Sequence, residues 1–229
     1  MHERSLPTLR LMHLMSPNLP TGAFTYSQGL EWAVECGWIK NEEQTKQWLL
    51  CVLTDSLSYL ELPLLLRLYE AVKNGNKKKF QHWCQWMYAS RETFELREEE
   101  KQRSRALYSL LVKLPESENW PELDHWKSSL LQCQISGYAL AANHWEISVK
   151  NLLLGYTWSW LENAVAAAIK LVPLGQSEGQ RLMYELSPNI VNAVEHACSL
   201  DEQEIGASTP ALAIASSLHE SQYSRLFRS

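Results

Sequence analysis

The chain has 229 residues, a formal net charge of −5 and 45% hydrophobic residues. This length suffices to bury a core without disulfide bonds or metal ions, and the composition is that of an ordinary globular protein. The acidic balance argues against nucleic acid as the main partner, because nucleic-acid-binding domains carry basic surfaces. Abundant leucine, alanine, glutamate and lysine favour helices over strands.

The first ninety residues show four helix signals after a loop at residues 16–22, which holds two prolines and a glycine. Thr25 with Gln28, and Asn41 with Gln44, have the spacing of capping boxes. Pro63 is tolerated in the first turn of a helix that begins at Glu61. Capping and apolar periodicity together predict helices over Tyr26–Cys36, 42–59, 61–74 and Lys77–Ser90.

The segment Arg91–Arg105 holds five positive and five negative side chains. Arg91 with Glu95, and Glu99 with Arg103, are spaced as ion pairs along one helix face. A solvated helix face is one interpretation of this segment. A charged surface for a partner is the other, because Phe94 and other apolar residues lie within it.

Residues 148–172 form the most apolar segment, and we expect them to be the central helix. Ser148 is a candidate N-cap, and Pro173 and Gly175 follow the last apolar residue. Apolar residues occupy every side of the helical wheel, which predicts a helix buried in a protein core or in a membrane. Glu162 and Asn163 lie mid-segment, and burying them in lipid is costly, so we favour the core.

The second half of the chain shows further helix signals and one polar loop, residues 115–121. Ser177 with Gln180 resembles another capping box, and Ser187 before Pro188 has the pattern of an N-cap followed by proline. Residues 175–179 contain two glycines but lack the lysine of a phosphate-binding loop, which indicates a helix junction. The predicted helices here are Leu123–Asn143, 177–186, 188–199 and Pro210–Leu218. The sequence thus predicts about ten helices in one all-α domain.

Catalytic signatures are weak. No nucleophile elbow, zinc-protease motif or phosphate-binding loop occurs, and no two of the seven histidines lie four residues apart. Aspartates are too few for a magnesium cluster. These observations favour a binding protein without a catalytic, metal or cofactor site of its own. The alternative is a helical enzyme that uses Glu162 as a buried acid or base.

The two ends of the chain carry the residues best suited to partner recognition. The N-terminal stretch lacks the pattern of a signal peptide, so we expect a cytoplasmic protein. The tail Gln222–Ser229 contains two aromatic residues and two arginines, which are favoured anchors in interfaces. The loop that precedes Tyr26 has a similar polar-aromatic character, so the two ends could form one combined surface.

Six short motifs along the chain resemble the UreF family of urease accessory proteins. They are residues 16–31 (SPNLPTGAFTYSQGLE), 89–93 (ASRET), 96–99 (LREE), 158–163 (WSWLEN), 170–176 (KLVPLGQ) and 219–227 (HESQYSRLF). The resemblance covers the chain nearly end to end. It implies an all-α protein, a single domain over residues 1–229, that has no enzymatic activity and no cofactor of its own.

The resemblance also implies partners. Members of this family form homodimers in the cytoplasm and bind a second accessory protein, UreD or UreH. That complex recruits the GTPase UreG, which carries nickel and delivers it to apo-urease. Neither nucleic acid nor a membrane is an expected partner.

The resemblance assigns partner binding to the two ends of the chain. Phe24 and Arg225 match the family's aromatic loop position and tail arginine, which are tied to recruitment of the GTPase. Some members carry tyrosine where Phe24 lies, so stacking rather than a hydroxyl hydrogen bond is expected here. The tail is expected to dock on UreD/UreH. The expected partner-binding residues are Phe24, Tyr26, Gln28, Glu31, Tyr223, Arg225 and Phe227.

Overall fold

The computed structural model describes residues 5–206 and 209–228. Every regular element in these residues is helical, which confirms the all-α prediction. The α-helices are α1 (Leu6–Leu14), α2 (Leu30–Glu35), α3 (Glu42–Cys51), α4 (Glu61–Lys73), α5 (Lys77–Ala89), α6 (Phe94–Leu111), α7 (Glu122–His125), α8 (Lys127–Leu130), α9 (Gln134–His144), α10 (Val149–Leu171), α11 (Gln176–Ser199) and α12 (Pro210–His219). Short 3₁₀ turns lie at η1 (Ala23–Thr25), η3 (Pro115–Asn119) and η4 (Glu202–Glu204), and a π-helical turn, η2 (Val52–Leu57), continues α3.

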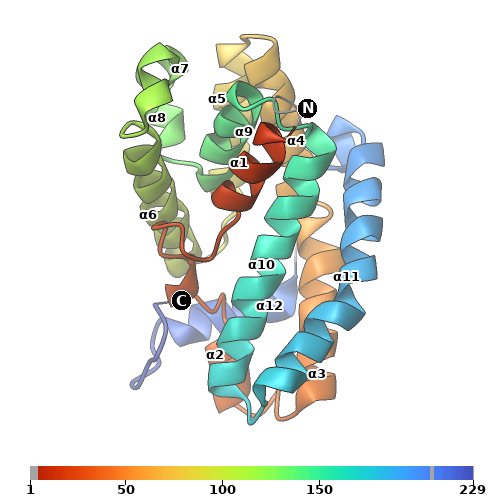
Figure 1. Cartoon of the computed structure of the whole chain (residues 1–229). Helices are drawn as coiled ribbons and strands as arrows, with labels where there is room; N and C mark the ends of the chain where they lie inside the picture. The colour runs from red at the N-terminus through yellow and green to blue at the C-terminus, as the bar shows by residue number, and fades with distance from the viewer. Residues whose placement is uncertain (1–4, 207–208, 229) are drawn as a thin grey trace.

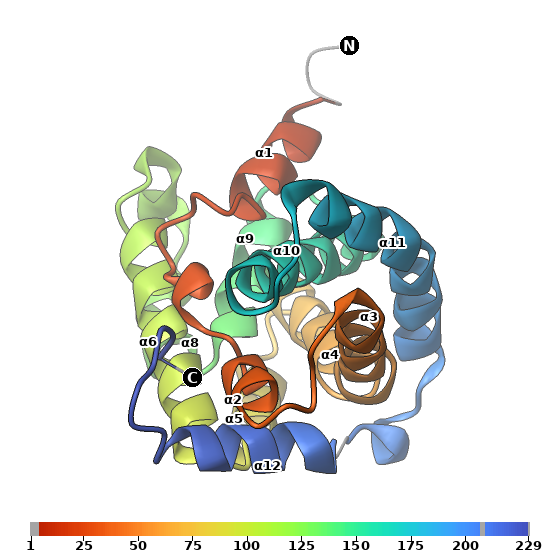
Figure 2. The same ribbon diagram turned by 90° about the horizontal axis from the view of Figure 1, so that it is seen from below.

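Helix α10 lies at the centre of the fold. Figure 1 shows it running the length of the molecule between α6 and α11, and in Figure 2 the other helices surround it. It contacts α11, α4, α9, α2 and α1. The large hydrophobic core is built on these helices, and a smaller cluster lies at the far end of α10, where Ala167 and Ala168 meet Leu30, Ala215 and Phe227.

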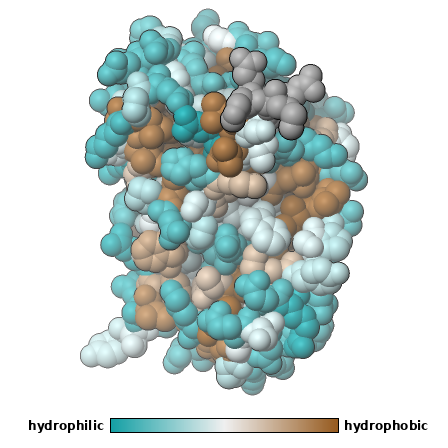
Figure 3. Space-filling view, viewed as in Figure 1, coloured by the Kyte–Doolittle hydropathy of each residue, from teal (hydrophilic) through white to brown (hydrophobic). Residues whose placement is uncertain are grey.

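The start of α10 is as predicted, but its burial is not complete. The Ser148 hydroxyl accepts the Asn151 backbone N–H at 3.3 Å, which caps the helix. Helix α1 crosses at Gly155, where an added Cβ would lie only 2.9 Å from Leu11. The prediction of burial on every side is wrong, since one face remains exposed at Asn151, Trp158, Ala166 and Lys170. The visible surface in Figure 3 is mostly hydrophilic, with apolar patches separated from one another.

The membrane interpretation of α10 finds no support. Among the described residues, no single helix is long and apolar enough to cross a bilayer. A bent pair of segments, Glu42–Leu57 with Glu61–Lys73, meets the length and composition criteria together.

The predicted start of α2 is wrong. The helix begins at Leu30 rather than Tyr26, and Thr25 does not cap it. Gln28 and Gly29 both adopt positive φ, at 52° and 81°, so the chain turns before the helix starts. The Gln28 side chain bonds to Glu99 and Trp160 instead of the local backbone. Tertiary contacts therefore override the capping signal.

Three other predicted boundaries are also wrong. Helix α11 is continuous through Pro188, and the Ser187 hydroxyl donates back to the Tyr184 carbonyl inside the helix. The N-cap is Gly175, whose N–H is accepted by Glu178, so Ser177 and Gln180 do not form the predicted box. The predicted helix over residues 123–143 is divided among α7, α8 and α9. The other predicted helices agree within a few residues, and the Asn41 cap is confirmed by its bond to the Gln44 N–H at 3.0 Å.

Candidate functional site

The charged segment that forms α6 is not a solvated face. Arg91, Glu95, Glu99 and Glu100 are all buried, so that interpretation is wrong. The predicted Glu99–Arg103 pair is confirmed at 2.8 Å. The predicted Arg91–Glu95 pair is wrong, because Arg91 precedes the helix and both residues bond to distant parts of the chain.

The first of two buried charge networks, here called the inner network, surrounds Arg91. Its guanidinium lies 2.6 Å from Glu61 of α4 and 2.9 Å from Glu100 of α6. The Tyr156 hydroxyl donates to Glu61 at 3.0 Å, and the Gln134 backbone N–H donates to Glu100 at 2.7 Å. The inner network therefore joins α4, α6, α9 and α10.

Burial and charge perturb the pKa values of the inner network. Burial raises the pKa of Glu100, and the nearby Arg91 opposes that shift only in part. Burial alone would lower the pKa of Arg91, but Glu61 and Glu100 raise it well above its usual value. Two carboxylates thus share one guanidinium deep in the fold, which makes the ionisation of Glu100 costly.

The second network, here called the tail network, fastens the end of the chain. The Glu31 carboxylate accepts the backbone N–H groups of Leu226 and Phe227 at 2.6 and 2.8 Å. Arg225 donates to Glu95 at 2.9 Å. His219, which is fully buried, lies 2.8 Å from Glu95 and 3.1 Å from Glu31. The tail network therefore joins the tail to α2, α6 and α12.

The same tail lies beside the N-terminal loop. The Arg228 backbone N–H donates to the Thr25 carbonyl at 2.8 Å, and the Arg228 guanidinium donates to Gln102 at 3.1 Å. The Tyr26 hydroxyl bonds to the same Gln102 oxygen at 3.2 Å. Phe227 is buried in the small cluster, with the Lys170 ammonium 5.6 Å from its ring centroid. The structure thus brings the N-terminal loop and the tail together, as one combined surface requires.

A small cavity of about 40 Å³ lies beneath the N-terminal loop. Its lining includes Tyr26, Gln28, Glu99, Arg103 and Asn163. Gln28 donates to Glu99 at 3.1 Å and accepts the Trp160 ring N–H at 3.2 Å. Burial, followed by the charge of Glu99, raises the pKa of Tyr26. This volume is that of one or two water molecules rather than a substrate.

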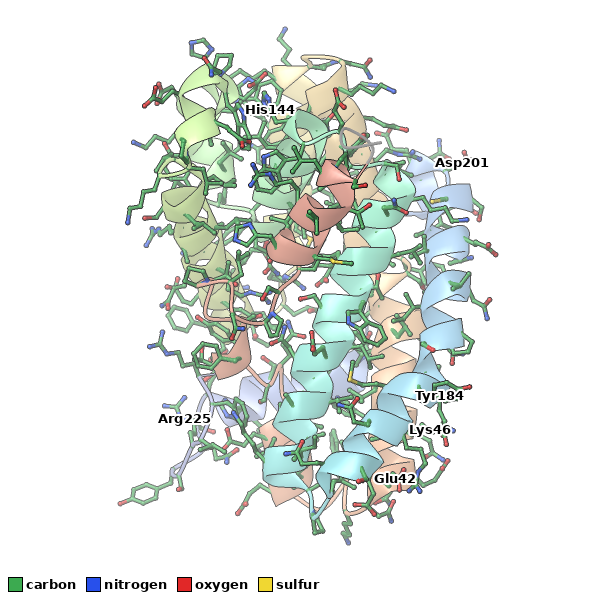
Figure 4. All side chains as sticks on the ribbon, viewed as in Figure 1. Glu42, Lys46, His144, Tyr184, Asp201 and Arg225 are labelled. Carbon is green, nitrogen blue, oxygen red and sulfur yellow. The ribbon has the colours of Figure 1, made fainter. Side chains whose placement is uncertain are left out.

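The predicted partner-binding residues fall into two groups. Phe24 is 58% exposed and Tyr223 is fully exposed, and the Arg225 side chain is 41% exposed. Figure 4 shows Arg225 on the side of the molecule opposite to Tyr184 of α11. The others lie further inside, with Gln28 half-buried and Tyr26, Glu31 and Phe227 buried.

Two surface hollows meet at Phe94, and the tail lines one of them. The first, of about 500 Å³, is lined by Arg225 and Arg228 together with Glu95, Glu98 and other α6 residues. The second, of about 590 Å³, lies between the start of α6 and α12 and includes Ile214 and Leu218. Phe94 and Glu220 line both hollows. The surface around the tail therefore combines exposed apolar and charged groups, as protein interfaces do.

Sequence reasoning missed three residues of this site: Glu95, His219 and Glu220. Helix spacing pairs Glu95 with Arg91, and no histidine spacing singles out His219. Glu220 accepts the backbone N–H groups of Phe94 and Glu95 at 2.8 and 3.3 Å, at the first turn of α6. The signal that could have found His219 and Glu220 is their place at the start of the tail motif, residues 219–227.

Two features bear on chemistry in this chain: metal-binding side chains and the surroundings of Glu162. In the part of the chain that the structure describes, no group of three or more metal-binding side chains is positioned to hold a metal ion. Glu162 is half-buried, and burial raises its pKa. It is not among the residues that line the small cavity beside α10, although its neighbours Trp160 and Asn163 are.

Together, these features define an all-α protein whose N-terminal loop and tail are joined by polar contacts into one partly exposed surface. The sequence model of the UreF family matches residues 39–187. Proteins named urease accessory protein UreF are similar over nearly their full lengths. One from Alcanivorax borkumensis is 53% identical, covering 96% of this chain and 97% of its own. Those of Pseudomonas putida and an Enterobacter strain are each 45% identical, covering 98% and 99% of this chain and 98% and 100% of their own.

The chain therefore belongs to the UreF family of urease accessory proteins. The matched residues 39–187 contain the inner network but neither Phe24 nor the tail. The full-length similarity to the named relatives extends over both chain ends.

Proposed function

We propose that this protein is a scaffold for nickel insertion into urease. With UreD or UreH it recruits the GTPase UreG, which brings nickel to apo-urease. The proposal takes residues 1–229 as one domain that works as a homodimer in the cytoplasm, with the loop and tail binding partners. Family membership supports the role in urease maturation. The observation that carries the proposal is the docking of the tail beside the N-terminal loop.

In this proposal the buried and the exposed members of the expected partner-binding set have different roles. Glu31, Phe227, Tyr26 and Gln28 hold the surface together from inside, because their side chains bond or pack within the fold. The exposed side chains of Phe24, Tyr223 and Arg225 touch partners.

Arg225 suits a contact with a partner. It uses one guanidinium nitrogen for Glu95 and remains 41% exposed. A guanidinium carries five N–H donors, so it can bond a partner carboxylate at the same time. Phe24 offers only its ring, which supplies stacking and apolar burial.

The test is recruitment of the GTPase by a tagged complex of this protein with UreD/UreH. We expect Arg225→Ala to weaken capture of UreG about tenfold, which corresponds to about 1.4 kcal/mol, while the helical content stays unchanged. Arg105→Ala is the matched control, since Arg105 is an exposed arginine on α6. Equal capture by Arg225→Ala, Arg105→Ala and the unaltered protein would sink the assignment of Arg225.

The second candidate function is a helical enzyme with Glu162 as its acid. The raised pKa of Glu162 favours it, because a general acid must hold its proton near neutral pH. Replacing Glu162 by Gln removes the proton donor at nearly constant shape. If the scaffold proposal holds, Glu162→Gln supports urease activation in cells as well as the unaltered protein does. Loss of activation with an intact fold would favour the enzyme instead.

A further inference from the structure

The geometry around His219 assigns its protonation state. Its Nδ1 lies 2.8 Å from a Glu95 oxygen and its Nε2 lies 3.1 Å from a Glu31 oxygen. A neutral imidazole has one donor nitrogen and one acceptor nitrogen, so it could satisfy only one ionised carboxylate. The other contact would place two acceptors against each other in a site without solvent, which is costly.

We infer that His219 is an imidazolium that positions the tail, by neutralising the two carboxylates that hold it. This inference rests on the proposed function only for the partner contact that the tail makes. Glu31 and Glu95 carry two negative charges, and Arg225 supplies one positive charge. With both carboxylates ionised, the protonated ring supplies the second positive charge, and the tail network is then neutral.

The charged groups near the ring come from several elements. Helix α2 contributes Glu31, α6 contributes Glu95, and the tail contributes Arg225. On α12 itself, Glu220 is turned toward the backbone N–H groups of α6 rather than toward the ring. On α10, Lys170 lies over the Phe227 ring at 5.6 Å.

The ring connects the two halves of the tail network. Glu31 holds the backbone at Leu226 and Phe227, and Glu95 holds the Arg225 side chain. His219 bonds to both carboxylates, so it fixes their positions relative to each other. Without the imidazolium, the two carboxylates repel each other and the tail loses its rigid acceptors. His219 is thus a positioning residue for Arg225, which would touch the partner.

The first test is nitrogen NMR of the His219 ring in the full chain, assigned by comparison with His219→Gln. We expect hydrogen on both ring nitrogens in the unaltered protein. In Glu95→Gln, the amide nitrogen can donate to Nδ1 while its oxygen still accepts from Arg225. The ring should then become neutral, with its one hydrogen on Nε2. A singly protonated ring in the unaltered protein, or no change in Glu95→Gln, would overturn the inference.

The second test follows release of the tail by trypsin, which cleaves after Arg225 when the tail opens. Cleavage of a locally opened segment reports the population of the open form. We expect His219→Gln to speed the release of the C-terminal peptide about tenfold. Glu95→Gln should stay close to the unaltered rate, because a neutral ring fits a neutral amide. His125→Gln is the matched control, since His125 is exposed on α7.

These outcomes separate a charge effect from simple packing. If His219 only fills space, the protonation of its ring does not respond to Glu95→Gln, and loss of the Glu95 charge speeds tail release. Either result would contradict the inference. If His219→Gln is cleaved at the unaltered rate, the inference also fails. Circular dichroism identifies a variant that has lost its fold, in which case the ring spectra of the unaltered protein and of Glu95→Gln decide.

The partner assay keeps this inference distinct from the proposed function. Loss of UreG capture by both His219→Gln and Arg225→Ala supports both. Faster tail release in His219→Gln with full UreG capture by both variants would support the positioning role and sink the assignment of the tail to UreG recruitment. Normal tail protection in His219→Gln, with loss of capture only in Arg225→Ala, would support the assignment of the tail to UreG recruitment. It would contradict the positioning role of His219.

Discussion

The inner network and the tail network both use carboxylates of α6, only one and a half turns apart, but they join different kinds of structure. Around Arg91, the partners Glu61, Glu100 and Tyr156 all lie on long helices of the core. Around His219, two of the contacts reach the last residues of the chain. The tail lies outside any helix and packs into the small cluster through Phe227.

The two networks use similar ion pairs, but we expect them to open under different conditions. Opening the inner network requires separation of several core helices, so we expect it to open only with global unfolding. The tail network can open locally, at a cost well below the stability of the whole protein. A docked tail with a modest opening cost can present or withdraw Arg225 without loss of the fold. Four predictions test this contrast, from the largest effect to the smallest.

Removing Arg91 should have the largest effect on stability. Arg91→Met leaves Glu61 and Glu100 buried without their counter-ion, which costs about 3–5 kcal/mol of unfolding free energy. Urea unfolding followed by circular dichroism measures this loss. Arg105→Met is the control, because Arg105 is an exposed arginine on α6. A loss below about 1 kcal/mol, typical of exposed ion pairs, would show that the inner network is not structural.

Deleting residues 222–229 should have an intermediate effect. The deletion exposes the site of Phe227 and leaves Glu31 without two backbone donors, for an expected loss of about 2 kcal/mol. Helical content should remain, because these residues are outside any helix. The same urea titration measures the loss. If the truncated chain unfolds completely, the tail belongs to the cooperative core and the contrast between the networks fails.

The pH dependence of the unfolding free energy should report the ionisation of Glu100. Its pKa is raised in the fold, so folding favours its protonated form. That contribution is fully present below the unfolded pKa, near 4.3, and is lost as pH rises through the raised value. Glu100→Gln mimics the protonated form at every pH. The unaltered protein should therefore lose stability relative to this variant as pH rises from 4 to 7. A constant difference across that range would contradict the raised pKa.

Replacing Phe24 by Ala should have the smallest effect on stability. The ring is 58% exposed, so its loss should change the unfolding free energy by less than about 0.5 kcal/mol. Capture of UreG should nevertheless fall, because the proposal gives this ring a partner contact. Tyr184→Ala is the matched control, because this exposed ring lies on α11, on the side of the molecule opposite to Arg225. Equal capture by both variants and the unaltered protein would remove Phe24 from the interface.

Local sequence signals located most of the helices but misjudged where several of them begin. Asn41 and Ser148 cap as expected, since each side chain reaches an N–H only three residues away. Thr25 carried the same signal and failed, because Gln28 bonds across the fold to Glu99 and Trp160. Pro188 lies inside α11, whose buried face packs on α10 and outweighs the cost of one proline.

The sequence by itself determined the all-α class, the central helix α10 and the family, because these follow from local propensity and from motifs contiguous in the chain. It also pointed to both chain ends. Helix spacing correctly paired Glu99 with Arg103, but only the tertiary structure decided the partners of Glu95 and Glu100. Spacing along the helix offered Glu95 to Arg91, whereas folding gave it to His219, 124 residues away, and to Arg225. A buried charge takes the partner that the fold brings within reach, and helix periodicity carries no information about a partner that comes from another element.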